Sequence, residues 1–148
     1  MNSFMKKYLV IGLMLLPFLA TSQSRNVWIH HADEFYSHAD YQNALLNYQS
    51  ALSDTAGLHS MIIPYEVNYT KQRLKENDVE IDSAQVVPLR DYIEHQIGMC
   101  LLQTYDYKKA EAHLSAKNTL DSYPEDLYHL AVAQMNMNHH EAAITTFE

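Results

Sequence analysis

The chain has 148 residues, and its ten Lys and Arg against eighteen Asp and Glu give a formal net charge of −8. Such an acidic chain is repelled by phosphate backbones, so nucleic acid is not expected as a partner. Only three glycines are present, together with many alanines, leucines and tyrosines, which favours a single domain of helices over a sheet. The one cysteine, Cys100, cannot form an internal disulfide and is expected to be a buried core residue.

Residues 1–22 have the pattern of a signal peptide. Lys6 and Lys7 supply the positive start, an apolar run follows, and small residues precede the expected cleavage after Ser22. The alternative is a membrane anchor, but the run is shorter than the roughly 20 residues that cross a bilayer, and Pro17 interrupts it. We therefore expect an exported protein with a net charge of about −10, because cleavage removes two lysines and no acidic residue.

Residues 25–56 are expected to form a pair of packed helices. Apolar side chains at three-and-four spacing predict the first helix, and a turn at 38–40 leads into the second. Each helix alone would leave an apolar stripe exposed, so the two are expected to pack together. The residues of the two stripes are Trp28, Ile29, Ala32, Phe35 and Tyr36, then Tyr41, Ala44, Leu45, Tyr48, Ala51 and Leu52.

Residues 57–90 are interpreted as a degenerate unit. Leu58, Met61, Ile62, Tyr65 and Tyr69 fall at helical spacing, which predicts a helix starting near the proline at position 64, followed by a polar loop. The alternative is a short β-hairpin formed by residues 79–81 and 85–87, where polarity alternates briefly.

Residues 91–123 and 124–148 predict two further helix pairs. The first of these pairs follows Pro88, at a position where proline can open a helix, and the second starts at Pro124 and is incomplete. Their apolar positions are Ile93, Ile97, Gly98, Leu101 and Leu102 with Tyr107, Ala110, Ala112 and Leu114, then Leu127, Leu130, Ala131 and Val132 with Ala143, Ile144 and Phe147.

One short pattern recurs in three of these units. An alanine at positions 44, 110 and 143 is preceded twelve residues earlier by a small residue and followed four residues later by a bulky one. Small residues at such spacing allow two helices to pack closely, and repeats of this kind build surfaces that hold other proteins. The small residues are Ala32, Gly98 and Ala131, and the bulky ones are Tyr48, Leu114 and Phe147.

These residues resemble the tetratricopeptide repeat (TPR), a helix-turn-helix unit of about 34 residues with an aromatic, a small residue, an alanine and a second aromatic at fixed places. The chain departs from that pattern at Lys117, at Gln134 and throughout 57–90. The resemblance implies an all-α, TPR-type solenoid over residues 23–148, with one degenerate repeat and a truncated last repeat.

The resemblance also implies a binding site for a protein or peptide ligand. In this family ligands lie in a concave groove lined by the first helices, and the lysines and arginines of its chaperone-binding members have no counterpart here. The protein-binding groove is expected to show Ile29, Asp33, Tyr36, Tyr92, His95, Met99, Leu102, Tyr128, Val132 and Met135.

The signal peptide followed directly by repeats resembles the start of exported proteins of gliding Gram-negative bacteria. In that group such repeats often precede a propeller-like segment and a peptidoglycan-binding domain similar to outer membrane protein A, and some members belong to the type nine secretion apparatus. The resemblance implies a location in the periplasm or at the outer membrane, and a role as a scaffold in a cell-envelope complex. Because the chain ends within a helix, without a polar capping helix, we expect it to be part of a longer protein.

Neither metal nor catalytic chemistry is predicted. The nine histidines include no pair at helical four-residue spacing, and the acidic run from Glu76 to Asp82 lacks the glycine and terminal glutamate of a calcium loop. No nucleophile elbow, phosphate-binding glycine loop or kinase signature is present, so no catalytic, cofactor or metal residue is proposed. The first hypothesis is a non-catalytic protein-binding module, and the alternative is a structural spacer ahead of a missing peptidoglycan-binding domain.

Overall fold

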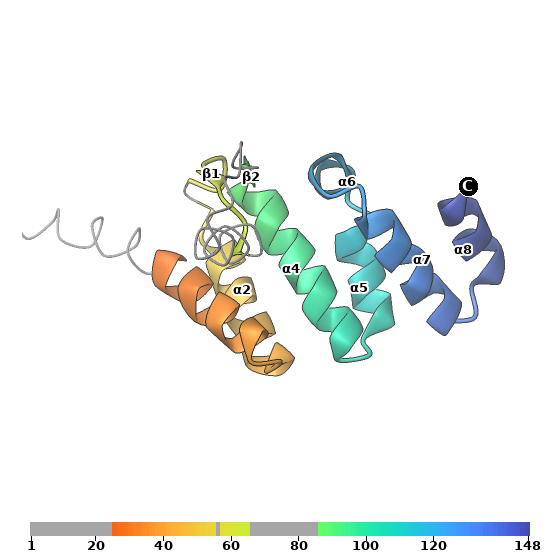
Figure 1. The fold of residues 1–148 in the computed structure, drawn as a ribbon, viewed down its shortest axis with the longest axis horizontal. Coiled ribbons are helices and arrows are strands. Elements are labelled where there is room, and N and C mark those ends of the chain that lie inside the picture. The colour runs from red at the N-terminus through yellow and green to blue at the C-terminus, as the bar shows by residue number, and fades with distance from the viewer. Residues whose placement is uncertain (1–24, 56, 66–85) are drawn as a thin grey trace, which may run out of the picture.

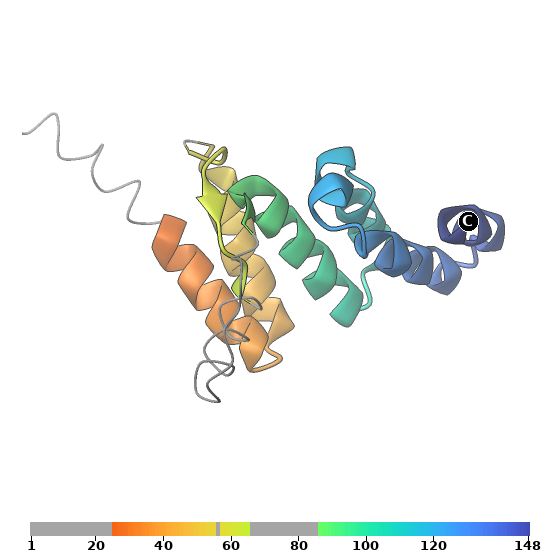
Figure 2. The ribbon, with the colours of Figure 1, turned by 45° about the horizontal axis from the view of Figure 1, so that its top comes forward.

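The structure, a computed structural model, describes residues 25–55, 57–65 and 86–148. Most of these residues lie in a row of helices (Figures 1 and 2). The expectation that the chain is mostly helical is confirmed for these residues. The elements are a helix at 25–37, α2 (Tyr41–Ser53), β1 (Met61–Ile62), β2 (Val87–Pro88), α4 (Leu89–Gln103), α5 (Tyr107–Leu114), α6 (Lys117–Ser122), α7 (Asp126–Asn136) and α8 (His140–Phe147).

Three helical hairpins share one turn geometry. Ala39, Tyr105 and Asn138, at equivalent places after the first helix of each hairpin, have φ values of 59°, 64° and 61°. In each turn the following amide donates to the carbonyl five residues back, at 2.9 Å in all three cases. This is the left-handed helix ending of a Schellman motif, and it reverses the chain so that the second helix runs back along the first.

The second helix of each hairpin starts after this turn, but only two of the three are capped by a side chain. Asp40 accepts a hydrogen bond from the Asn43 amide, and Asp106 accepts one from the Lys109 amide. The Lys109 ammonium also holds the pKa of the Asp106 carboxyl below its usual value. The third N-cap residue, His139, makes no side-chain cap hydrogen bond.

Replacing His139 with aspartate is therefore expected to stabilise the third hairpin. A carboxylate at the N-cap can accept from a free amide of the first turn and interacts favourably with the helix dipole, which stabilises by about 1 kcal/mol. Urea unfolding followed by circular dichroism measures the change, and His139→Ala provides the matched control. Equal stabilities of the aspartate and alanine variants would contradict this assignment of the cap.

The core lies between the helices of neighbouring hairpins. Within a hairpin, α4 approaches α5 closely, because a Cβ on Gly98 would lie 2.6 Å from the Leu114 Cδ2 atom. Between hairpins, α4 packs against α2 and α7 packs against α5. The largest fully buried side chains include Tyr48, Tyr92, Ile93, Ile97, Leu101 and Leu114.

Residues 57–62, which precede the predicted helix, form a turn and a strand. Residues 57–59 form a turn, and β1 pairs antiparallel with β2, with Ile62 opposite Val87. The Leu89 amide then donates to the Ser60 carbonyl at 2.8 Å, so the strand pair holds the start of α4. The helix expected near position 64 has begun at Tyr65, while residues 79–81 of the alternative hairpin lie outside the described residues.

The predicted unit 91–123 contains a third helix, α6, that the two-helix pattern does not include. Its Thr119 is buried, and its Ser122 hydroxyl donates to the Asp91 carboxylate of α4 at 2.6 Å. In Figure 1 α6 and the strand pair lie at the edge of the molecule opposite the turns at 38–39 and 104–105.

The signal peptide prediction concerns residues outside the described part of the chain.

Candidate protein-interaction surface

The ten residues predicted to line a groove do not form one continuous accessible surface. Three of them are buried: Ile29, Tyr92 and His95. Five are half-buried: Asp33, Tyr36, Met99, Leu102 and Val132. Only Tyr128 and Met135 are exposed, at 61% and 50%. Within this set, the exposed fraction of the side chains is therefore greatest on the third hairpin.

Asp33 is occupied by contacts within the chain. The hydroxyls of Tyr48 and Tyr92 both donate to its Oδ1 atom, at 2.6 and 2.5 Å, and the two rings meet edge to face with centroids 6.2 Å apart. Burial, together with the neighbouring Tyr92 and Asp33, raises the pKa of Tyr48 far above its usual value, so its hydroxyl remains a proton donor. Asp33 thus joins the first helix to α2 and α4.

His95 is covered by the connection from α6 to α7. Its Nδ1 atom lies 2.8 Å from Oδ1 of Asp126, which is fully buried in the first turn of α7, and its ring stacks on Tyr123 with centroids 4.0 Å apart. Nearby, burial lowers the pKa of His129, and the charge of Asp126 acts in the opposite direction. These contacts fasten α7 to α4, so His95 is a cross-link between hairpins and not a surface ligand.

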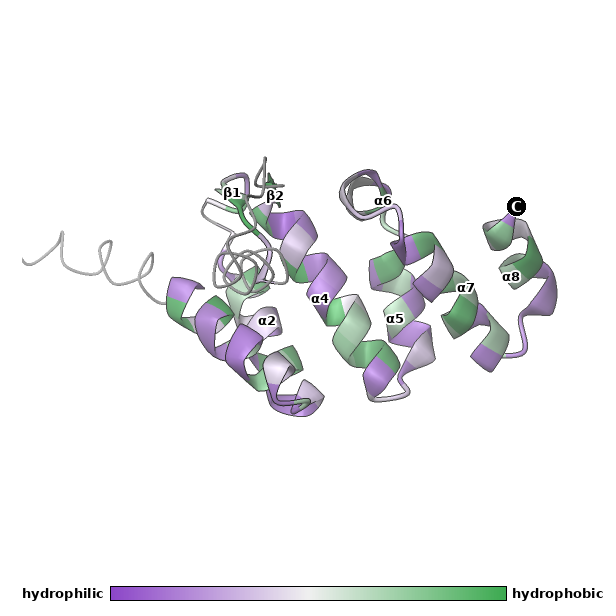
Figure 3. Ribbon diagram, in the orientation of Figure 1, coloured by the Kyte–Doolittle hydropathy of each residue, from purple (hydrophilic) through white to green (hydrophobic). Residues whose placement is uncertain are grey.

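The other end of the predicted set belongs to an exposed apolar surface on the third hairpin. Tyr128, Val132 and Met135 follow one another at helical spacing on α7, and the Tyr128 ring lies 6.1 Å from that of Phe147 on α8. Ile144 lies one turn before Phe147. We call these five residues the C-terminal apolar face. Figure 3 shows apolar residues along α8, at the end of the row of helices.

Two residues of this face differ sharply from their repeat equivalents. Phe147 is 53% exposed, whereas Tyr48 and Leu114, at the same place in the first two hairpins, are fully buried. Ile144 is 59% exposed, and its equivalent on α2 is half-buried. The sequence places both residues on a packing stripe. In the described part of the chain, however, α8 packs mainly against α7, whereas α2 and α5 are each also covered by the following hairpin.

The surroundings of the C-terminal apolar face are acidic. No lysine or arginine occurs after Lys117, and five carboxylates follow it. Glu125, Glu141 and Glu148 are exposed on the third hairpin. Apart from histidines, the exposed charged side chains of residues 124–148 are therefore all acidic.

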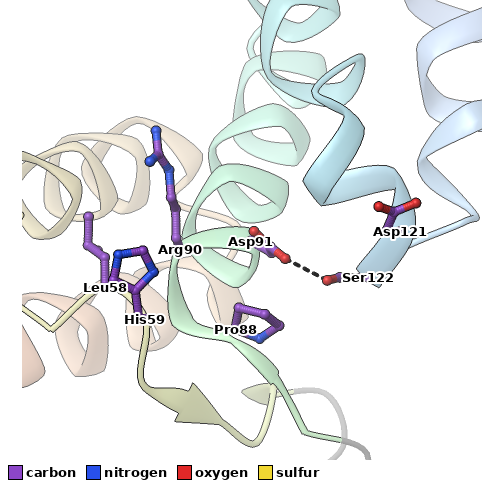
Figure 4. A pocket seen from close by; sticks show the side chains of 7 residues that line it. All are labelled: Leu58, His59, Pro88, Arg90, Asp91, Asp121 and Ser122. Carbon is purple, nitrogen blue, oxygen red and sulfur yellow. Dashed lines mark hydrogen bonds between the residues drawn. The ribbon is translucent and has the colours of Figure 1, made fainter.

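A pocket of about 390 Å³ lies where the strand pair, the start of α4 and the end of α6 meet (Figure 4). Its polar groups mostly interact with one another or with α4: Asp91 accepts from Ser122, and the Arg90 Nε atom lies 3.9 Å from Glu94. Sequence reasoning did not identify this pocket, because its residues come from three segments with no shared motif: Leu58, His59, Pro88, Arg90, Asp91, Asp121 and Ser122. The hydrogen bond from Ser122 to Asp91 links α6 to α4 at this pocket, so the contacts of its lining support a structural role.

Three further observations concern metal binding, membrane-spanning helices and the cysteine. In residues 25–55, 57–65 and 86–148, no three side chains of His, Cys, Asp or Glu are arranged to hold a metal ion. No helix within these ranges is both long enough and apolar enough to cross a bilayer. Cys100 is buried as predicted, and burial raises the pKa of its thiol to about 12, which keeps it protonated and unreactive.

Comparison of the chain with protein-family models, curated proteins and solved structures gives no match.

Proposed function

We propose that the chain is a non-catalytic protein-interaction module, and that the C-terminal apolar face is where it binds its partner. The observation that carries the proposal is that four apolar side chains of this face, those of Tyr128, Met135, Ile144 and Phe147, are each at least 50% exposed. Exposed apolar patches rimmed by polar residues are typical of protein-binding sites. The acidic rim and the aromatic side chains Tyr128 and Phe147 fit such a site.

The tetratricopeptide assignment is part of the same proposal. It is supported by the three turns with matching φ values and by small buried residues at positions 32, 98 and 131. It is also supported by the alanines at 44, 110 and 143, which are at most 2% exposed. Stacked hairpins of this type present extended surfaces to other proteins.

The location of the module follows from its first 22 residues. Their pattern of charge, apolar run and small residues supports export. We propose that the exported module serves as a scaffold in an assembly of the periplasm or outer membrane. The spacer alternative requires no ligand, so the two functions differ in whether the C-terminal apolar face contacts another protein.

Site-specific photocross-linking in the native cells tests the proposal. A photoreactive amino acid is placed at position 144 or, as a matched control, at Leu46, an aliphatic residue of α2 that is 61% exposed. Position 144 should yield a protein adduct that position 46 does not yield, because only the former lies in the binding face. No adduct at 144, or equal adducts at both positions, would favour the spacer.

A further inference from the structure

We infer that the pocket between the strand pair, α4 and α6 binds a small zwitterion, a molecule with both an ammonium group and a carboxylate, such as an amino acid or a short peptide (Figure 4). The pocket shares no residue with the C-terminal apolar face, so this ligand is additional to the proposed protein partner. Its volume of about 390 Å³ falls within the range of about 300–1,000 Å³ that is typical of small-molecule pockets.

Asp91, in the first turn of α4, is a buried carboxylate that no basic side chain of the described residues pairs with. It is 7% exposed, and its side chain accepts one hydrogen bond, from the Ser122 hydroxyl to Oδ2 at 2.6 Å. That hydroxyl and the positive end of the α4 dipole compensate a full negative charge only in part. Because a buried charge is unfavourable unless it is paired, Asp91 favours a cation in the adjoining pocket.

The other buried acid of the described ranges has the basic partner that Asp91 lacks. Asp126 is fully buried, and its Oδ1 atom lies 2.8 Å from Nδ1 of His95. Both acids lie in the first turn of a helix, so the helix dipole is common to the two positions. What distinguishes Asp91 is that it borders a pocket and has no histidine, lysine or arginine of the described chain beside it.

A second carboxylate lines the same side of the pocket. Asp121 of α6 precedes Ser122, is exposed, and makes no side-chain contact with other described residues. An ammonium group has three donors and carries one charge, so it can bond Asp91 and Asp121 together. We therefore place the ammonium group of the ligand between these two carboxylates.

The opposite side of the pocket carries basic side chains. In Figure 4 His59 and Arg90 lie across the pocket from Asp121. The Arg90 side chain is 57% exposed, and its Nε atom is 3.9 Å from Oε1 of Glu94, so this exposed pair is weak and leaves the guanidinium able to bind an anion. A guanidinium binds carboxylates through parallel hydrogen bonds, which places the carboxylate of the ligand on this side.

The two charged sides together select the class of ligand. A simple amine would leave Arg90 without its anion, and a simple carboxylic acid would be repelled by Asp91 and Asp121. Leu58 and Pro88 add apolar surface to the lining, which fits a short apolar segment between the two charged groups of the ligand.

The test is an NMR titration of the full, nitrogen-15-labelled chain with the dipeptide alanyl-alanine. Amide signals of the pocket should shift: those of residues 58, 59, 90, 91, 121 and 122. Two blocked dipeptides are the controls: N-acetylation removes the ammonium charge, and C-terminal amidation removes the carboxylate. Each should bind at least about tenfold more weakly than the zwitterion. Titration with free alanine distinguishes the two sources, because the tighter ligand of the pair identifies an amino acid or a short peptide.

Variants of the chain locate the binding. Asp91→Asn retains an acceptor for Ser122, and Asp121→Asn changes an exposed side chain, so the second variant is expected to fold even if the first does not. Each should weaken binding of alanyl-alanine at least about fivefold, whereas Glu125→Gln, an exposed acid outside the pocket, should leave it unchanged. Equal affinity for the acetylated and free dipeptides, or equal effects of the 121 and 125 variants, would overturn the inference. So would the absence of pocket shifts up to about 10 mM dipeptide.

Discussion

Replacing Asp33 with alanine is expected to lower the free energy of unfolding by about 3 kcal/mol. The variant leaves the hydroxyls of Tyr48 and Tyr92 without the carboxylate that both bond in the native chain, at 2.6 and 2.5 Å. Both tyrosines are fully buried, so water cannot readily replace that acceptor. Urea unfolding monitored by circular dichroism measures the loss.

Three matched variants separate this hydrogen-bond effect from a general effect of substitution. Asp33→Asn retains an acceptor oxygen and should lose much less stability than Asp33→Ala. Tyr48→Phe and Tyr92→Phe each remove one hydroxyl and keep the ring, so each should lose about 1 to 2 kcal/mol. If the asparagine and alanine variants are equally stable, the two tyrosine hydrogen bonds are not what Asp33 contributes.

Gly98→Val is expected to destabilise the chain by about 3 kcal/mol, because it inserts volume at a place where α4 closely approaches Leu114 of α5. A Cβ at this position would lie 2.6 and 2.8 Å from Cδ2 and Cγ of Leu114, which is fully buried. Relief would require Leu114 to move within the core. Thermal unfolding followed by circular dichroism detects the loss as a lower Tm.

The control for Gly98→Val is Ala112→Val, an exposed position of α5. That change introduces the same side chain into a helix at a cost of less than about 1 kcal/mol. A double-mutant cycle with Leu114→Ala should show that much of the Gly98→Val effect disappears once the opposing side chain is removed. Equal effects at positions 98 and 112 would mean that the close approach does not limit residue size at 98.

Much of the helical arrangement could be predicted from local signals. The apolar stripes and the small residues twelve positions before each alanine lie within a few turns of the residues that they order. Such periodic signals specify amphipathic helices, because they need no knowledge of distant contacts. The expected turn at 38–40 and the helices at 25–37 and Tyr41–Ser53 illustrate this agreement.

The strand pair and α6 could not be predicted in the same way. Met61 and Ile62 satisfy helical spacing with their neighbours, and their pairing with residues 87–88 spans a separation that periodicity does not detect. The six-residue helix α6 is too short to show a full apolar stripe. Its position depends on the tertiary contact between Ser122 and Asp91.

The candidate site was predicted only in part, because its exposure depends on tertiary contacts. Asp33 and His95 occupy first-helix positions expected to face a groove, but tyrosines engage Asp33, and Asp126 and Tyr123 cover His95. Conversely, Ile144 and Phe147 have the pattern of core residues and are exposed in the structure. Sequence spacing identifies which residues share a face, but the neighbouring element decides whether that face is covered.

The interaction function is tested most directly by measuring the affinity for the protein that position 144 cross-links, using the unmodified chain, Ile144→Glu and Leu46→Glu. Isothermal titration calorimetry at equal salt should show at least about tenfold weaker binding for Ile144→Glu and unchanged binding for Leu46→Glu. Equal affinities for all three chains would contradict the assignment of the C-terminal apolar face as the binding site.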